Sequence, residues 1–171
     1  MPLLRNGNIA EYILSEGGDT RTSTFLFERK AFMDVMFDDK LAKHQDWDLT
    51  IRFSEKYKLV HDPLKTVDIY INAGNRMSYT NAYSASDYFL DKHKGKIGKQ
   101  SLYNFKLNIC FNAFRFEGYS EDFKRRLKEL TALGKDPKVK HKPKYYLMRY
   151  YLLRIFLPAL IILHRRLKYG G

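Results

Sequence analysis

Two short runs of strand-forming residues constrain the fold of this chain most. Residues 22–27 are rich in β-branched and aromatic side chains, and they follow the breaker pair Gly17 and Gly18. Residues 66–71 are almost wholly strand-forming, and residues 59–61 are a weaker strand candidate. Since the segments between and after these runs carry helical patterns, the sequence predicts an α/β fold that becomes mainly helical toward its C-terminus.

The strongest helical pattern in the first half covers residues 45–57. Its apolar residues recur at four-residue steps, as Leu49, Phe53 and Tyr57. Asp46 and Asp48 fall in the first turn, where the helix dipole favours negative charge. A shorter helix is predicted just before Phe37, because Phe32, Val35 and Met36 follow one another at helical spacing.

The second half of the chain is predicted to be mostly helical. Helices are expected over residues 84–93, 100–116 and 121–133, with Ser120 as the N-cap of the last of them. The single cysteine, Cys110, lies between Ile109 and Phe111 and therefore predicts a packed structural thiol in a reducing compartment. Residues 1–7 lack the pattern of a secretory signal, so cytosolic synthesis is the default expectation.

Positive charge is concentrated at the C-terminal end. The chain has a formal net charge of +12, and residues 135–171 hold ten Lys or Arg but one acid, Asp136. Residues 145–163 are the most hydrophobic stretch, yet Arg149, Arg154 and Pro158 interrupt them. This pattern favours a helix lying in the plane of an anionic membrane surface over one that spans the membrane. Because the basic residues alternate with apolar ones, nucleic-acid binding is not expected.

The two acids Asp46 and Asp48, separated by one residue, allow three interpretations. They could hold a divalent metal, but ligands of that kind usually follow a strand, whereas these open a helix. They could merely stabilise the helix start, which is worth about 0.3–1 kcal/mol each. Alternatively, a carboxylate held at a helix N-terminus beside an aromatic residue can act as a general base toward a hydroxyl group. Spacing alone favours the structural role.

A resemblance changes this balance. Residues 22–30, then Phe37-Asp38-Asp39-Lys40-Leu41, then residues 45–53 resemble the acceptor-side half of family 2 glycosyltransferases, which are inverting enzymes of the GT-A fold. Those enzymes show a strand, a basic pair, a Phe-Asp-Glu-x-Leu turn and an acid-Asp-x-Asp-Leu-x-x-Arg helix. The order and spacing agree over about residues 20–80. The resemblance implies a partial GT-A fold with a small mixed sheet, followed by a mainly α-helical extension.

The resemblance also implies roles for individual residues. Asp46 matches the catalytic base that deprotonates the acceptor hydroxyl, and Trp47 and Gln45 would border the acceptor site. Arg76 and Ser78 match a loop that follows the last strand and contacts substrate in those enzymes. An ordinary solvated loop charge stays an equally open interpretation of Arg76. Arg52 is expected to be the structural partner of a nearby acid. The chain departs from the family at two positions, because Gln45 stands where the family commonly has Glu and Met36 stands where it commonly has Gly.

The domain prediction follows from the same comparison. Residues 1–80 are expected to be the acceptor-side portion, residues 81–134 a helical extension, and residues 135–171 a basic membrane-surface segment. The nucleotide-binding half of such enzymes should precede residue 1. Whether the chain is itself an enzyme is therefore left open. A divalent metal, Mg or Mn, is expected for the full-length enzyme only, and none is expected to bind this chain alone.

Two functions remain from the sequence. The first is the C-terminal part of an inverting glycosyltransferase that uses a nucleotide-sugar donor and a glycan or lipid-linked acceptor in bacterial cell-envelope or capsular polysaccharide synthesis. Its expected location is the cytoplasmic face of the cell membrane, peripherally bound, with a separate N-terminal half as partner. The alternative is a non-catalytic membrane-associated fragment or partner subunit.

Overall fold

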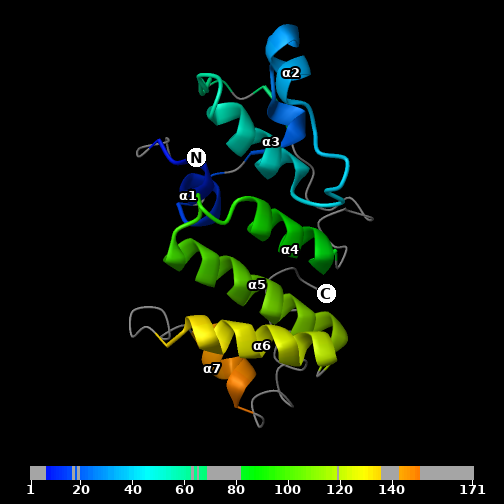
Figure 1. Cartoon of the computed structure of the whole chain (residues 1–171), viewed down its shortest axis with the longest axis vertical. Helices are drawn as coiled ribbons and strands as arrows, with labels where there is room; N and C mark the ends of the chain where they lie inside the picture. Colours follow the sequence, from blue (N-terminus) through cyan, green and yellow to red (C-terminus); the bar gives the residue numbers. More distant parts are fainter. Residues whose placement is uncertain are drawn as a thin grey trace. The chain divides into compact units, whose positions relative to one another are not determined.

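The computed structural model of the protein describes residues 7–16, 18, 20–62, 64, 66–68, 82–118, 120–135 and 143–150. The chain divides into two compact units, Met1–Leu102 and Tyr103–Gly171. Helices make up all of the regular secondary structure in the described residues (Figure 1). They are α1 Ile9–Leu14, the 3₁₀ helix η1 Thr22–Thr24, α2 Arg29–Val35, α3 Gln45–Ser54, α4 Tyr83–Lys92, α5 Lys99–Glu117, α6 Glu121–Leu133 and α7 Pro143–Arg149.

The predicted α/β fold, a partial GT-A fold with a small mixed sheet, is wrong for the part of the chain that the structure describes. Residues 22–27 form η1 and then an extended segment without a strand partner. Thr24 closes this turn locally, because its Oγ1 and its backbone N–H both donate to the carbonyl oxygen of Arg21. Threonine hydroxyls can offer the backbone such local bonds in place of a sheet ladder. Residues 59–61 and 66–68 also form no strand, and residues 69–71 lie outside the described residues.

The predicted helices are confirmed, with small shifts at their ends. The segment expected at residues 45–57 is helical over Gln45–Ser54 and continues as a turn. The helices expected over residues 84–93, 100–116 and 121–133 correspond to α4, α5 and α6. The division into residues 1–80, 81–134 and 135–171 concerns roles in an enzyme and stays a prediction.

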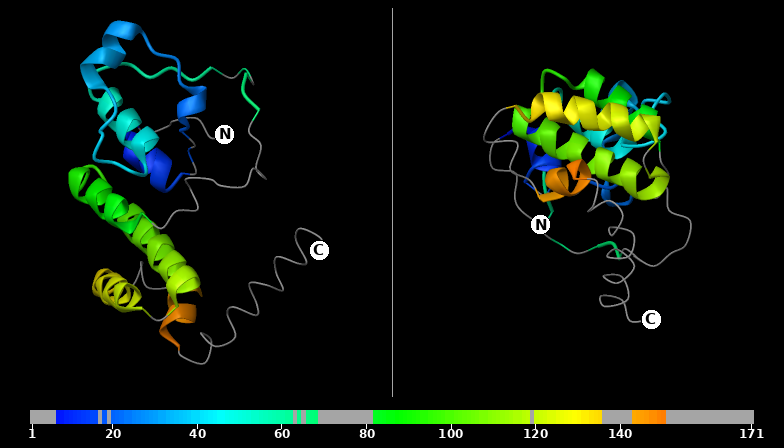
Figure 2. Two further views of the ribbon diagram at one scale, coloured as in Figure 1. Left: turned by 90° about the vertical axis from the view of Figure 1, so that its right-hand side faces the viewer. Right: turned by 90° about the horizontal axis from the view of Figure 1, so that it is seen from below.

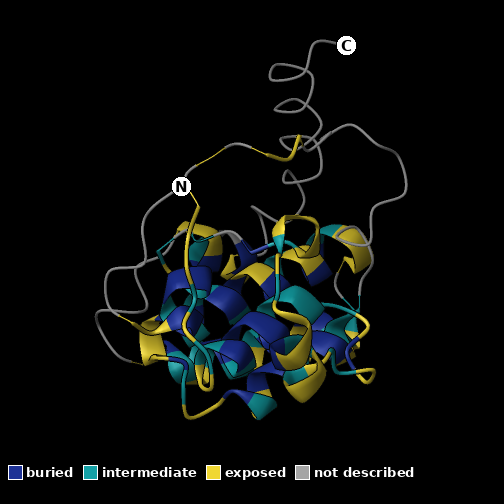
Figure 3. Cartoon of the chain, turned by 90° about the horizontal axis from the view of Figure 1, so that it is seen from above, coloured by how far each residue is buried: buried dark blue, intermediate teal, exposed yellow. Residues whose placement is uncertain are grey.

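The core of the first unit forms around α3. Leu49, Ile51 and Phe53 of this helix are buried, and α1 packs against it with Ala10 and Ile13 also buried. Figure 3 shows that the buried positions lie mostly on helices, whereas the connecting segments are largely exposed or half-buried. The apolar face read from the sequence is therefore the face that fills the core.

Helix α1 also caps the start of α5. The carboxylate of Glu11 accepts hydrogen bonds from the backbone N–H of Gly98, at 2.5 Å, and from the hydroxyl of Ser101. Asn8 caps α1 through its side chain and donates to the carbonyl oxygen of Lys96, at 3.2 Å. A Cβ atom at position 98 would lie 2.9 Å from Glu11 Oε1, so a residue larger than glycine there would force this carboxylate to shift.

The second unit contains α6 and α7 packed beside α5 (Figure 2). Ser120 is the N-cap of α6, as predicted, and its hydroxyl accepts from the N–H of Phe123 at 3.1 Å. Cys110 is fully buried, which confirms the predicted packed thiol. An ion pair of 2.7 Å between Lys106 and Glu129 joins α5 to α6.

The hydrophobic stretch 145–163 is described only as far as residue 150. Its first residues lie in α7, where Tyr145 and Met148 are buried while Arg149 and Tyr150 are exposed. Among the helices of the described residues, none has the length and apolar character needed to cross a bilayer. Residues 151–163 lie outside the described part of the chain.

Candidate functional site

The start of α3 is held by a histidine in a left-handed conformation. His44 has φ 67° and ψ 22°, and it precedes the first helical residue. Such a conformation costs a non-glycine residue about 1–3 kcal/mol and persists only where the surroundings fix it. Here His44 Nε2 lies 2.9 Å from the hydroxyl of Ser86, and its ring stacks on Trp47 with centroids 4.7 Å apart. Contacts with α4 thus fix the direction in which α3 begins.

The two acids of this first turn lie in different environments. Asp46 is half-buried, and its Oδ1 accepts from the backbone N–H of Trp47 at 3.0 Å. Asp48 is 0% exposed. Two residues correspond to about 200° around a helix, so the carboxylates leave α3 on opposite sides. The structure therefore separates a partly accessible acid from a sequestered one.

Asp48 is the centre of a buried charged cluster. His93 Nε2 and Lys92 Nζ, both from the end of α4, each lie 2.8 Å from its Oδ1. Arg52, one turn further along α3, donates from Nε to Oδ2 at 2.8 Å. Burial alone would raise the pKa of Asp48, but the hydrogen bonds from His93, Lys92 and Arg52 outweigh it and hold that pKa well below its usual range.

Arg52 also fixes the end of α2. Its two terminal nitrogens donate to the carbonyl oxygens of Val35 and Met36, each at 2.6 Å. The last carbonyl groups of a helix lack partners within the helix, so these bonds satisfy groups that would otherwise need water. The prediction that Arg52 is the structural partner of a nearby acid is confirmed, with Asp48 as that acid.

Lys92 connects the cluster to the turn that follows α2. Its Nζ lies 2.5 Å from Asp38 Oδ2, which also accepts from the hydroxyl of Tyr88 at 3.0 Å. The other oxygen of Asp38 accepts from the backbone N–H of Lys40 at 3.0 Å. The hydrogen bond from Lys92 is the main cause that lowers the pKa of Asp38. One lysine therefore bridges a carboxylate of the turn and the buried carboxylate of α3.

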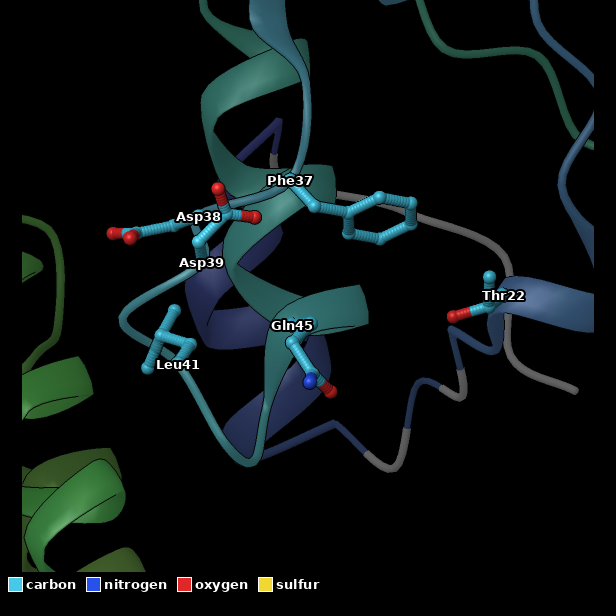
Figure 4. Close-up of a pocket in the computed structure, with 6 residues that line it drawn as sticks. All are labelled: Thr22, Phe37, Asp38, Asp39, Leu41 and Gln45. Atoms are coloured by element: carbon cyan, nitrogen blue, oxygen red, sulfur yellow. The ribbon is translucent and has the colours of Figure 1, made fainter.

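An open pocket of about 390 Å³ lies beside this turn. Figure 4 shows the side chains of Phe37, Gln45 and Thr22 around one open space, with the remaining lining residues on the turn that borders it. The full lining consists of Thr22, Phe37, Asp38, Asp39, Leu41 and Gln45. Carboxylate, amide and hydroxyl groups beside an aromatic ring can hydrogen-bond a polyhydroxy ligand and cover its apolar face.

The predicted site residues fall into two groups. Gln45, Asp46 and Trp47 are consecutive in the first turn of α3, and Gln45 lines the pocket. Arg76 and Ser78 lie outside the described residues. Within the described ranges, no group of three or more His, Cys, Asp or Glu side chains is placed to hold a metal ion. The roles assigned to these five residues stay predictions.

Sequence reasoning missed the contribution of α4. Lys92 and His93 lie 44 and 45 residues after Asp48, and nothing local in the sequence pairs them with it. By contrast, Asp48 and Arg52 are four residues apart on a predicted helix, a spacing at which opposite charges meet. The pairing of Asp48 with Arg52 could therefore be predicted from the sequence, whereas the contacts of Asp48 with Lys92 and His93 could not.

Comparison with known proteins gives one informative similarity. The chain is 27% identical over 122 residues to the amylovoran biosynthesis glycosyltransferase AmsB of Erwinia amylovora. The match covers 70% of this chain and 40% of AmsB, so the chain spans less than half of the length of that relative. No family model matches the chain, and no solved structure matches it. The similarity supports a glycosyltransferase-like role.

Proposed function

We propose that the chain is the acceptor-side portion of an inverting family 2 glycosyltransferase. In this proposal the enzyme moves a sugar from a nucleotide-sugar donor to an acceptor hydroxyl. The supporting observation is that the two acids at the start of α3 differ in burial and in their bonding partners. The carboxylate of Asp48 is fully buried and is bound by Arg52, Lys92 and His93, while Asp46 stays partly accessible on a helix start that tertiary contacts hold rigidly. The similarity to AmsB supplies the reaction class.

Asp46 is the general base in the proposed reaction. Its carboxylate takes the proton of the acceptor hydroxyl while that oxygen forms a bond to the anomeric carbon of the donor. The bond between that carbon and the nucleotide diphosphate breaks on the opposite face, so the configuration inverts. A position in the first turn of α3 favours the ionised carboxylate that this step needs, because the N-terminal end of a helix is electropositive.

The residues around Asp46 are assigned to substrate. Trp47 and Gln45 border the acceptor, and Gln45 reaches the pocket that Phe37 and Asp38 also line. Trp47 is half-buried and stacked on His44, so its ring is held in one orientation. Arg76 and Ser78 are assigned to contacts with substrate by resemblance alone.

The donor site is proposed to lie outside this chain. AmsB is much longer than the part that the chain matches. A separate or preceding N-terminal portion would bind the nucleotide sugar, with Mg or Mn supplying the charge that stabilises the leaving diphosphate. The acceptor would be a glycan or a lipid-linked glycan of bacterial cell-envelope or capsular polysaccharide synthesis, and the name of AmsB, a glycosyltransferase of amylovoran biosynthesis, is consistent with a biosynthetic role.

The proposal is tested by supplying the donor-binding portion. The purified 171-residue chain should not turn over UDP-sugars, and adding the polypeptide encoded upstream of it should produce transfer to a lipid extract. Turnover by the chain alone would contradict the placement of the donor site. An absence of transfer with the upstream portion present would favour a non-catalytic membrane-associated subunit.

A further inference from the structure

The buried cluster around Asp48 has a feature that the proposed chemistry does not use. Lys92 is the one member that contacts a second carboxylate, that of Asp38, according to the described contacts. Asp38 lines the pocket, whereas Asp48 is part of the helix that carries Asp46. Lys92 therefore connects the pocket-lining turn to helix α3, and the proposed function requires these two segments to keep a fixed position relative to each other.

The ion pairs of Lys92 with Asp38 and Asp48 are strengthened because all three side chains are largely removed from water. The side chain of Lys92 is 23% exposed, that of Asp38 is 17% exposed and that of Asp48 is 0% exposed. Charges that are mostly removed from water interact more strongly and are screened less by salt than surface pairs. Without the ammonium group, two carboxylates would face each other across the space that it fills, and like charges that are poorly solvated repel.

The two carboxylates depend on Lys92 to different degrees. Asp48 keeps Arg52 and His93 when Lys92 is lost, so the start of α3 keeps two of its three anchors. Asp38 keeps the hydroxyl of Tyr88 and bonds within its own turn. Loss of Lys92 should therefore loosen the turn much more than the helix.

We propose that Lys92 is a positioning residue that holds the pocket-lining turn, residues 37–41, against the start of α3. This inference rests on the proposed function, because it makes the acceptor's binding place dependent on a residue of α4. Lys92 sets where the acceptor hydroxyl lies relative to Asp46, and it takes no part in proton transfer.

The first test is a kinetic comparison of Lys92→Met with wild type in the enzyme completed by its upstream portion. A lipid extract of the expressing cells is titrated as acceptor, with UDP-sugar as donor. The half-saturating amount of extract should rise about tenfold, while kcat stays within about twofold and the donor KM is unchanged. Lys92→Arg should restore most of the loss, because its guanidinium can bridge the same carboxylates. A fall in kcat alone would overturn the positioning role.

The matched control is Lys56→Met. Lys56 pairs with Asp34 of α2 at 3.0 Å, but its side chain is 54% exposed and Asp34 does not line the pocket. This variant should leave the half-saturating amount of extract unchanged. If the half-saturating amount of extract rises equally in Lys56→Met and Lys92→Met, the cause is a general loss of positive charge, and the positioning role of Lys92 is overturned.

A second test does not depend on sugar transfer. Hydrogen exchange of the 171-residue chain should show that Lys92→Met accelerates exchange at the Leu41 amide, which donates to the carbonyl of Asp38, by about tenfold. The amide of Asp48, which donates to His44, should keep its protection. Asp38→Asn breaks the same bridge from the turn side and should behave alike, even if Lys92→Met folds poorly.

The outcomes separate the two proposals. Unchanged exchange at Leu41 in both variants would overturn the positioning role of Lys92, whatever the enzyme does. Faster exchange together with full transfer by Asp46→Asn would leave the positioning of the turn in place and remove the proposed function.

Discussion

At the scale of single residues, Asp46 and Asp48 lie in different environments although they are two positions apart. Asp46 stays partly exposed, whereas Asp48 is buried among Arg52, Lys92 and His93. The sequence alone could identify the pairing of Asp48 with Arg52, since both lie on one predicted helix. It could not identify Lys92 or His93, because their approach depends on how α4 packs. For the same reason the sequence could not show that Asp48 is buried while Asp46 is partly exposed.

The first prediction concerns Asp48. Asp48→Asn should lower the free energy of unfolding by about 3 kcal/mol, because it removes the buried carboxylate and leaves the partly buried Arg52 and Lys92 without their full counter-charge. Urea unfolding followed by far-UV circular dichroism measures the change. Asp34→Asn, in an exposed ion pair, is the control and should change the free energy of unfolding much less. Equal small effects would show that the cluster contributes little to stability.

The second prediction concerns the pH dependence of stability. Burial, with a smaller contribution from Lys43, lowers the pKa of His44 from 6.5 to about 4. The unfolded chain therefore takes up a proton below pH 6.5 while the folded chain does not, so the stabilisation present above pH 6.5 is lost as the pH falls toward 4. Wild type should lose about 2 kcal/mol more than His44→Asn between pH 7 and pH 4.5.

Asparagine is the appropriate replacement because it tolerates the left-handed conformation without titrating. Protonation of Asp48 also lowers stability as the pH falls, but in a lower pH range. Its depressed pKa gives a stabilisation that is lost below its ordinary value of 3.8. That transition is common to both proteins. Parallel stability curves for wild type and His44→Asn between pH 7 and 4.5 would show that His44 does not titrate as expected.

At the scale of elements, helices were predictable from this sequence and strands were not. The helices at 45–57 and 121–133 follow from local periodicity and from caps such as Ser120. Residues 22–27 have strand-forming composition, but strand propensity expresses how side chains pack on neighbouring strands. In the described residues no such neighbour accompanies them, and the hydroxyl of Thr24 closes a local turn instead.

The third prediction tests the contact between α1 and the start of α5. Gly98→Ala places a Cβ atom 2.9 Å from Glu11 Oε1, so the carboxylate must move away from the bonds it accepts from Gly98 and Ser101. The free energy of unfolding should fall by about 1 kcal/mol. Gly95→Ala is the control, because nothing lies within 4 Å of a Cβ atom there. If both variants unfold at the same urea concentration as wild type, Glu11 does not stabilise α5.

At the scale of the whole molecule, charge is distributed unevenly along the chain. Residues 135–171 carry ten of the 31 basic residues and one of the 19 acidic ones. The described part of this segment exposes Lys144, Arg149 and Tyr150. The sequence shows this asymmetry directly, but the acceptor, the donor and the linkage of the proposed sugar transfer depend on the shape of a site that composition does not determine.

The fourth prediction concerns membranes. The full chain should co-sediment with vesicles that contain anionic lipid at low salt, and binding should fall as salt rises, because basic residues near a membrane contribute about 1 kcal/mol each and are screened. A chain truncated to residues 1–134 should stay in the supernatant. Equal binding to neutral and anionic vesicles would contradict the prediction that the basic residues of 135–171 bind an anionic membrane surface.

The central claim is that Asp46 is the base of a sugar transfer, and one measurement tests it most directly. Radiolabelled sugar transfer to a lipid extract is measured for the enzyme completed by its upstream portion, as wild type, Asp46→Asn and Asp91→Asn. Asp91 is an exposed acid of α4, so Asp91→Asn should transfer sugar at the wild-type rate. Asp46→Asn should lower transfer by about 10²–10⁴-fold while donor binding is retained. Transfer by Asp46→Asn at the wild-type rate would contradict the account.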